Sequence, residues 1–262
     1  MSQNTLVKTI MIPTFVVSLP DCKDRRDCIS GMLNHLGIAF DFFDAVDGRN
    51  GLEKKYEAEI DRAATKQRGR ILSDAEYACA LSHINVYRKI VRDEIPYALV
   101  LEDDAIPLPP LTNFLKEGHW QDADLIQLWT VKTFVSWHGA KKLFGNHVSY
   151  VRVPHMNNPS TVAYTISLRA ARHIVKNALP VNKEADWPSC VNDLIREKQF
   201  RCVYPSIIIH QSIEGGTPSL ITPSLINKTK RRFLGVYVPP FKHVLRAYRR
   251  APYKLLYRRL RK

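Results

Sequence analysis

One run of five residues constrains the fold of this chain more than any other feature. Tyr97-Ala98-Leu99-Val100-Leu101 contains no charged position, and three acidic residues, Glu102-Asp103-Asp104, follow it at once. A strand with one face in water alternates apolar and polar residues, whereas a continuous apolar run is typical of a strand covered on both faces. Such strands belong to sheets with helices on both sides, so the run predicts a layered α/β domain.

Segments with strand and helix patterns alternate along the rest of the chain. Phe15–Leu19 and Phe40–Phe43 have strand composition, and Asp27–Leu36 between them has helical spacing, which predicts a parallel pair with a right-handed crossover. The same reasoning predicts strands at Leu125–Trp129, Val162–Ile166 and Ile207–Ile209, and helices at Asp74–Arg92, Arg169–Lys176 and from Asp186 onward. We therefore expect an α/β fold with a mainly parallel sheet flanked by helices.

The three carboxylates after the apolar run form the first candidate site. Ligands of open α/β sheets bind at the carboxyl ends of the strands, which is where Glu102, Asp103 and Asp104 emerge. In an extended chain Glu102 and Asp104 point to one side and Asp103 to the other, and two like charges so close repel unless a cation lies between them. Carboxylate oxygens suit Mg²⁺ or Mn²⁺, so the sequence predicts a metal site, with a solvated acidic turn as the alternative.

The distribution of charge divides the chain into a body and a tail. Lys and Arg number 39 against 25 Asp and Glu, but residues 228–262 hold 13 of the basic residues and none of the acidic ones. Residues 1–227 are therefore near neutral. Apolar tail positions with helical spacing are Phe241, Val244, Leu245 and Tyr248, then Tyr253, Leu256, Tyr257 and Leu260. This pattern predicts a basic amphipathic tail that binds an anionic membrane surface. Nucleic acid is the competing polyanion, but the chain contains no motif typical of nucleic-acid binding.

Cysteine usage and the first residues indicate the compartment. The five cysteines form no CxxC pair, and their odd number and irregular spacing favour reduced thiols over disulfides or a zinc site. The uncharged apolar segment Thr9–Pro20 is shorter than the ~20 residues that a membrane-spanning helix needs. We expect this segment to be the first strand of a cytoplasmic protein.

Three segments in one order carry a resemblance. They are Phe15–Leu19 with Arg25-Arg26 and Phe43–Gly48, then Glu76–His83, then Leu99–Asp104. Together they resemble glycosyltransferase family 25, whose bacterial members build lipooligosaccharide. The likeness covers about residues 12–110 and extends more weakly through Ala163–Ser167 to about residue 210. Ala75 and Ala78 depart from it, because the family usually has glycine there, and this leaves a close backbone approach at the Asp74 helix in doubt.

The resemblance implies a GT-A-like fold and the transfer of a hexose, commonly galactose, from a UDP-sugar with inversion at the sugar carbon. It also implies Mn²⁺ or Mg²⁺ and a lipid-linked oligosaccharide acceptor at the inner face of the bacterial inner membrane, a location that the basic tail fits. We assign the metal to Asp104 and Glu102, and expect Asp103 to share the metal, the ribose or the donor sugar.

Inverting transfer also needs a base that takes the proton of the acceptor hydroxyl. Asp186, beside Trp187, is the first choice, and the family tends to have Asp there. The equal alternative is that Asp186 caps the following helix, with Pro188 in its first turn. Asp193 and Glu184 are the reserves.

Other residues are candidates for the donor site. Arg25 or Arg26 could pair with phosphates, and Asp47 could contact uracil or ribose, although Asp47-Gly48 is also a common turn pair. His210, after the Ile207–Ile209 strand, could be a late metal ligand or a diphosphate donor, or a structural histidine.

The helix that begins at Asp74 carries three further donor-site candidates. Ser73 and Glu76 form a capping-box pattern, and Glu76, Ser82 and His83 fall in the segment that resembles the family. A lone histidine on such a helix is more often a satisfied core residue than a ligand.

Two other functions remain open on the sequence alone. A nucleotidyl- or phosphotransferase would use the same acidic strand end. A non-enzymatic module that binds polyanions or membranes would leave the acidic cluster with a structural role only.

Overall fold

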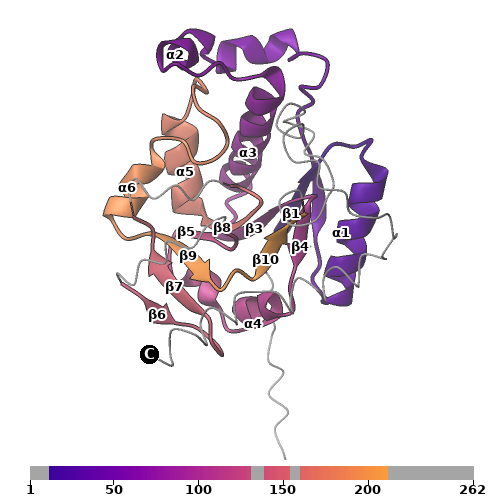
Figure 1. Ribbon diagram of the computed structural model, residues 1–262, viewed down its shortest axis with the longest axis vertical. Coiled ribbons are helices and arrows are strands. Elements are labelled where there is room, and N and C mark those ends of the chain that lie inside the picture. The colour runs from indigo at the N-terminus through magenta and orange to yellow at the C-terminus, as the bar shows by residue number, and fades with distance from the viewer. Residues whose placement is uncertain (1–11, 131–138, 154–159, 212–262) are drawn as a thin grey trace, which may run out of the picture.

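The computed structural model describes residues 12–130, 139–153 and 160–211. These residues form a large sheet with helices on both faces and a separate two-stranded sheet (Figure 1). The strands are β1 (Thr14–Ser18), β2 (Asp41–Asp44), β3 (Tyr97–Glu102), β4 (Ala105–Pro107), β5 (Leu125–Gln127), β6 (Lys141–Lys142), β7 (Val148–Val151), β8 (Ala163–Ser167), β9 (Phe200–Tyr204) and β10 (Ile208–His210). The helices are α1 (Lys23–His35), η1 (Lys54–Glu59), α2 (Arg62–Gln67), α3 (Asp74–Arg92), α4 (Pro110–Lys116), η2 (His119–Gln121), α5 (Leu168–Asn177) and α6 (Val191–Arg196). The predicted basic tail, residues 228–262, lies outside the described residues.

The large sheet has the strand order β2-β1-β3-β8-β5-β9-β7-β6. The strands β2, β1 and β3 run parallel to one another, as do β5 and β9, and the other four pairings are antiparallel. The α/β layering is confirmed, but the expectation of a mainly parallel sheet is corrected to a mixed sheet. No helix lies among the described residues between β5 and β8, so no crossover helix there requires β8 to run parallel to β5.

The predicted burial of β3 on both faces is confirmed. Along β1 and β3, side chains alternate between two cores, one under α3, α5 and α6 and the other under α1 and α4 (Figure 1). Ala98 and Val100 enter the first core, while Leu99 and Leu101 enter the second, and all four are fully buried. The alternation also sends the next two side chains to different sides of the sheet, Glu102 toward α3 and Asp103 toward α1.

Helix α3 starts as its sequence predicts. The Glu76 backbone N–H donates to Ser73 Oγ at 3.3 Å, and the Ser73 backbone N–H donates to Glu76 Oε2 at 2.8 Å, which completes the capping box. The helix expected from Asp186 is wrong, because α6 begins only at Val191. Trp187 has a φ of 72°, a left-handed conformation that a right-handed helix cannot contain, so Asp186 does not cap α6.

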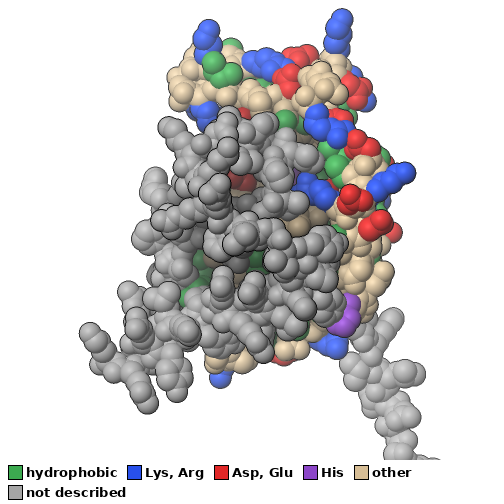
Figure 2. All heavy atoms as spheres, turned by 45° about the vertical axis from the view of Figure 1, so that its right-hand side comes forward, with side chains coloured by type: hydrophobic (Ala, Val, Ile, Leu, Met, Phe, Trp, Pro, Cys, Tyr) green, Lys and Arg blue, Asp and Glu red, His purple; other side chains and the backbone are tan. Residues whose placement is uncertain are grey.

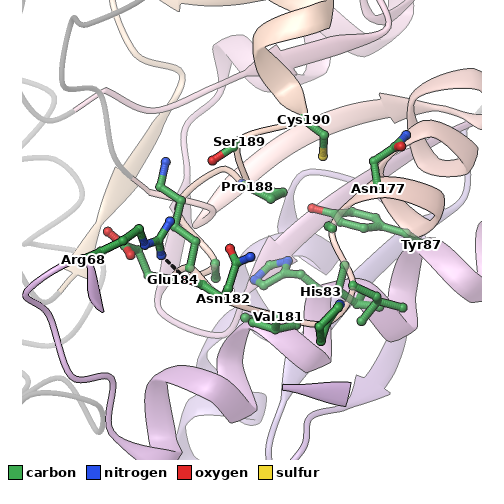
Figure 3. A pocket seen from close by; sticks show the side chains of 17 residues that line it. Arg68, His83, Tyr87, Asn177, Val181, Asn182, Glu184, Pro188, Ser189 and Cys190 are labelled. Carbon is green, nitrogen blue, oxygen red and sulfur yellow. Dashed lines mark hydrogen bonds between the residues drawn. The ribbon is translucent and has the colours of Figure 1, made fainter. Parts of the chain in front are cut away.

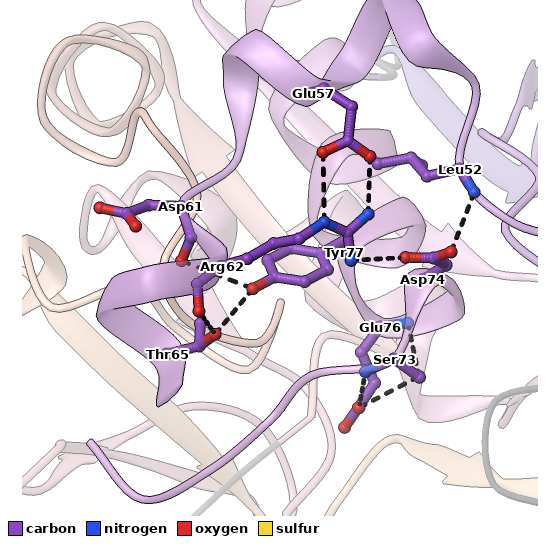
Figure 4. A network of polar contacts seen from close by, with 9 residues as sticks. All are labelled: Leu52, Glu57, Asp61, Arg62, Thr65, Ser73, Asp74, Glu76 and Tyr77. Atoms are coloured by element: carbon purple, nitrogen blue, oxygen red, sulfur yellow. Dashed lines mark hydrogen bonds and ion pairs between the residues drawn. The ribbon is translucent and has the colours of Figure 1, made fainter. Parts of the chain in front are cut away.

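A polar network ties the segment before α3 to the start of that helix (Figure 4). Arg62 pairs with Glu57 and with Asp74, each at 2.7 Å, and the Leu52 backbone N–H donates to the other oxygen of Asp74 at 3.2 Å. Tyr77 packs beneath the Arg62 guanidinium, and its hydroxyl lies 2.8 Å from Thr65 Oγ1. The network fixes the approach of residues 52–74 to the amino end of α3.

Charges of both signs lie side by side on part of the surface. Figure 2 shows Lys and Arg side chains interspersed with Asp and Glu over the end of the molecule that carries α2. None of the helices in the described part of the chain combines the length and apolar character needed to span a bilayer.

Gly48 resolves the doubt about close backbone approach at α3. A Cβ on Gly48 would lie 2.4 Å from the Asp74 carbonyl oxygen and 2.7 Å from the Ala75 Cα. The loop after β2 therefore rests directly on the first turn of α3. The glycine that permits this contact is on the loop, so alanine is tolerated at position 75 of the helix.

We expect Gly48→Ala to destabilise the chain by about 1–3 kcal/mol, because the added methyl group meets backbone atoms that cannot rotate away. Gly31→Ala is the matched control. Gly31 lies in α1, and its added Cβ would meet nothing within 4 Å, so this change should be neutral or stabilise by ~0.5–1 kcal/mol. Urea denaturation measures both, and a Gly48→Ala chain as stable as wild type would contradict the close contact.

Candidate active site

A cleft of about 350 Å³ lies where β1, β2 and β3 reach their carboxyl ends. Its walls include the ends of β1 and β3, the loop after β2, one face of α3 and the segment Glu184–Asp186. Of the residues that the sequence predicts for metal, donor or base roles, all line this cleft except the alternative Arg26 and the reserve Asp193. The structure thus brings the predicted residues together, while the role of each one stays a prediction.

Glu102 is held on the α3 side of the cleft by two hydrogen bonds. Its Oε1 lies 3.2 Å from His83 Nε2 and accepts from Thr161 Oγ1 at 2.7 Å. Burial works to raise the pKa of Glu102, but the hydrogen bonds and charge of these partners outweigh it and leave the pKa below its usual range. Both contacts fall on the same oxygen, so the other carboxylate oxygen carries neither of them.

Pairing of the small sheet brings His210 to the acidic strand end. In the antiparallel ladder of β4 and β10, His210 lies opposite Ala105, the residue after Asp104. His210 Nε2 is 3.5 Å from Asp104 Oδ2, and the ring packs against Trp129 with centroids 5.1 Å apart. One ligand atom each from Glu102, Asp104 and His210 lie within 4.8 Å of one another. The sequence assigns Glu102 and Asp104 to the metal and gives His210 as a possible late ligand.

Arg25 supplies the positive charge on the α1 side. A single terminal nitrogen of its guanidinium lies 2.7 Å from Asp103 Oδ1 and 3.0 Å from Asp104 Oδ2. Arg26, the alternative candidate, instead bonds the Ser18 carbonyl and pairs with Asp44, so it joins the ends of β1 and β2. Of the two arginines, Arg25 is the one that lines the cleft.

Asp103 is buried and incompletely compensated. Its side chain is 9% exposed, and it accepts a hydrogen bond from Ser18 Oγ at 2.7 Å in addition to the Arg25 contact. Burial raises its pKa from 3.8 to about 6, because the loss of water and the neighbouring acids outweigh Arg25 and Ser18. Asp103 therefore takes up a proton more readily than Glu102, whose pKa is lowered.

Asp186 lies across the cleft in the segment that precedes α6. Burial, together with the charge of Glu102, raises its pKa, although the Ser160 backbone N–H donates to it. A carboxylate with a raised pKa is a better proton acceptor near neutral pH, which suits the predicted base role. Of the reserves, Glu184 lines the cleft and pairs with Arg70 at 2.9 Å, whereas Asp193 lies in α6 and pairs with His173 and Arg196.

Three donor-site candidates also have structural partners. Asp47 accepts from the backbone and side chain of Arg49, which lowers its pKa. Glu76 completes the capping box and pairs with Arg70 at 2.6 Å. Ser82 Oγ accepts from the Val46 backbone N–H at 2.9 Å and so holds the loop after β2 against α3.

A second pocket of about 210 Å³ lies beside the cleft (Figure 3). The segment Asn177–Ala185 forms much of its wall, and Arg68 bonds the Asn182 carbonyl oxygen at its rim. His83, Glu184 and Ala185 line both cavities. The His83 side chain thus lies in the wall between them.

Comparison with known proteins agrees with this geometry. The model of a family described as glycosyltransferase family 25 (LPS biosynthesis protein) matches residues 11–188. This chain belongs to glycosyltransferase family 25.

Three relatives differ in how much of the chain they match. The lacto-N-neotetraose biosynthesis glycosyltransferase LgtE of Neisseria meningitidis is 29% identical over 183 residues, 66% of this chain and 64% of that protein. The lipooligosaccharide biosynthesis protein lic2B of Haemophilus influenzae is 29% identical over 106 residues, 40% and 38% of the two chains. The procollagen galactosyltransferase 1 of Danio rerio is 27% identical over 182 residues, 64% and 30%. The match therefore spans less than two thirds of the length of these relatives.

The residues that hold the three carboxylates at the end of β3 in place are not predicted from the sequence. Thr161 lies just before β8, Tyr164 is near the start of that strand, and Ser18 ends β1. Because β8 runs antiparallel to β3, its first residues lie beside the end of β3, where the Glu102 backbone N–H donates to the Val162 carbonyl oxygen. The expected parallel pairing would have placed them at the other end of the sheet.

The raised pKa of Asp103 predicts a pH dependence of stability. The folded chain binds this proton more tightly than the unfolded chain, so the associated stability is fully present below pH 3.8 and is lost as the pH rises through about 6. Between pH 4 and pH 7, wild type should lose roughly 2–3 kcal/mol more unfolding free energy than Asp103→Asn. Urea denaturation in EDTA measures both chains, and equal losses would show that Asp103 titrates normally.

Proposed function

We propose that this chain is a metal-dependent inverting hexosyltransferase that moves a hexose, with galactose expected, from a UDP-sugar to a lipooligosaccharide acceptor. The convergence of Glu102, Asp104 and His210 within 4.8 Å, in a cleft of a family 25 chain, carries the proposal. The printed names of LgtE and lic2B, a biosynthesis glycosyltransferase and a lipooligosaccharide biosynthesis protein, support the substrate class.

The cluster fits a divalent ion by its donor set. Two carboxylates and one imidazole offer hard oxygens with one borderline nitrogen, a set that suits Mn²⁺ better than Mg²⁺. His210 Nδ1 is buried and has no hydrogen-bond partner among the described residues, so no bond to that nitrogen fixes the ring. When bound, the ion would neutralise charge on the leaving diphosphate.

The residues of the chain divide the remaining tasks. Glu102, Asp104 and His210 would hold the ion, and the Arg25 guanidinium beside them offers a positive group to a diphosphate. Asp186 would take the proton of the acceptor hydroxyl, since burial raises the pKa of this carboxylate and makes it a better proton acceptor. Asp47, held by Arg49 at the rim, would contact the nucleoside.

Substitutions in the cleft should separate metal binding from proton transfer. Glu102→Gln and Asp104→Asn should weaken Mn²⁺ binding by roughly 100-fold and abolish transfer, because each removes a charged ligand. Asp186→Asn should keep Mn²⁺ and UDP affinity but lose at least about 100-fold in kcat. Titration with Mn²⁺ followed by mass spectrometry of UDP-sugar reactions measures each step.

The control for these three variants is Glu117→Gln, which removes an exposed carboxylate at the end of α4, remote from the cleft residues. Full transfer by Glu102→Gln and Asp104→Asn with unchanged metal dependence would refute the metal role. Release of nucleoside diphosphate together with an extended glycan distinguishes sugar transfer from nucleotidyl or phosphoryl transfer.

The basic tail supports a location on the inner face of the bacterial inner membrane. We infer that residues 228–262 associate with anionic lipid beside a catalytic domain at 1–227, since their 13 basic residues are unopposed by any acidic one. Such a tail would bring the cleft to a lipid-linked acceptor.

Replacing Arg249, Arg250, Arg258 and Arg259 by Gln in the full-length chain should lower its affinity for phosphatidylglycerol vesicles by about 100-fold or more, since each nearby cation contributes ~1 kcal/mol. Co-sedimentation measures the change, with phosphatidylcholine vesicles as the uncharged control. Equal binding of both chains to anionic vesicles would refute the electrostatic role of the tail.

A further inference from the structure

His83 is buried behind the cluster of Glu102, Asp104 and His210. Its residue is 2% exposed, although it lines the wall between the cleft and the second pocket (Figure 3). Both ring nitrogens are engaged, Nδ1 at 2.7 Å from the Tyr164 hydroxyl and Nε2 at 3.2 Å from Glu102 Oε1. A ring bonded at both ends has little capacity left to bind a donor substrate directly.

The hydrogen bonds that join Tyr164, His83 and Glu102 determine which nitrogen of the His83 ring carries the proton. Glu102 Oε1 already accepts the Thr161 hydroxyl, and an ionised carboxylate oxygen can only accept hydrogen bonds, so the contact with His83 requires a proton on Nε2. In the neutral ring Nδ1 is then an acceptor, and the Tyr164 hydroxyl donates to it. Burial raises the pKa of Tyr164 well above its usual range, which keeps that proton on the hydroxyl.

Tyr164 itself is fixed by the sheet. It is fully buried near the start of β8, where it pairs with Val100 of β3, and its ring packs edge-on against Tyr87 and Trp187 with centroids 6.2 and 5.3 Å apart. The hydroxyl therefore has one position available. Through the His83 ring, that position determines where the carboxylate of Glu102 is held.

We propose that Tyr164 and His83 are positioning residues that orient the Glu102 carboxylate toward Asp104 and His210. Thr161 bonds the same oxygen of Glu102 from the other side at 2.7 Å and completes the orientation. Neither Tyr164 nor His83 touches the metal or the substrate in this assignment. The inference rests on the proposed role of Glu102 as a metal ligand. It adds that His83 of α3 and Tyr164 of β8 must hold this ligand in the correct orientation.

A different role for the same residues would be direct metal binding by Cys79, His83 and Glu102, whose ligand atoms also lie within 4.8 Å of one another. Two observations favour positioning. His83 and Glu102 already bond each other directly, and burial raises the pKa of the Cys79 thiol well above its usual range, which disfavours the thiolate that a metal requires.

The first test removes one hydroxyl from the chain of contacts. Tyr164→Phe in the full-length protein should weaken Mn²⁺ binding by roughly 10- to 100-fold, the usual cost of losing an outer-shell partner. Tyr77→Phe is the matched control, because it removes another buried hydroxyl bond, to Thr65, on α3 but away from Glu102. Its Mn²⁺ affinity should equal that of wild type. Equal Mn²⁺ affinity in Tyr164→Phe and wild type would overturn the proposal.

The second test uses conservative replacements at His83. His83→Gln keeps an N–H donor near the position of Nε2 and should retain Mn²⁺ affinity within about 10-fold, whereas His83→Leu should lose roughly 100-fold. Equal losses in the two variants would overturn the positioning role. Weaker binding in Cys79→Ser would instead support direct ligation by the Cys79 group and would also overturn it.

A third measurement needs no metal. Nitrogen NMR of the His83 ring in metal-free wild-type protein should show a proton on Nε2 and an unprotonated, hydrogen-bonded Nδ1, and a proton on Nδ1 would overturn the proposal. If wild type shows this ring state but binds no Mn²⁺, the proposed metal role of Glu102 fails while the contacts of Tyr164 and His83 stand. If wild type binds Mn²⁺ normally and Tyr164→Phe has no effect on that binding, only the positioning role is refuted.

Discussion

The site depends on how three adjacent carboxylates are kept at the end of a buried strand. Removing a carboxylate from water is costly unless hydrogen bonds and opposite charges replace the lost solvation. Glu102 bonds His83 and Thr161, and its pKa is lowered. Asp103 accepts a hydrogen bond from Ser18 and shares the Arg25 guanidinium with Asp104, and its pKa is raised to about 6. Adjacent carboxylates therefore differ in pKa because their partners come from different places in the chain, α3 and the segment before β8 for Glu102, and α1 and β1 for Asp103.

Local pattern was sufficient to predict the elements that present these carboxylates. The uninterrupted run before Glu102 required cover on both faces of the sheet, and the two cores under α3 and α1 supply it. The capping pattern at Ser73 located α3 to the residue. Pairing direction could not be read in this way, because it depends on the path of the intervening chain. Because β8 runs antiparallel to β3, Thr161 and Tyr164 lie beside the end of β3, a position that the local pattern does not predict.

The motif residues on α3 show why residue type alone could not separate binding from support. Glu76 and Ser82 were candidates for donor contacts, and both line the cleft, yet Glu76 closes the capping box and Ser82 holds Val46. The expected cap at Asp186 failed because Trp187 takes a left-handed conformation, which no local propensity indicated. Asp186 is consequently left without a capping role and faces the cleft, where its raised pKa is set by burial.

Arg25 links the electrostatics of the cluster to the ligands it could accept. One nitrogen of its guanidinium contacts Asp103 and Asp104 together, and Asp104 Oδ2 also lies 3.5 Å from His210 Nε2. Any cation that binds Asp104 Oδ2 therefore shares that oxygen with Arg25 and weakens the attraction that holds the guanidinium there. A guanidinium released from a carboxylate is a bidentate partner for phosphate oxygens. Under the proposed function, this geometry would couple binding of a cation at the acids to binding of an anion at Arg25, the pairing of charges that a nucleoside diphosphate with its metal ion presents.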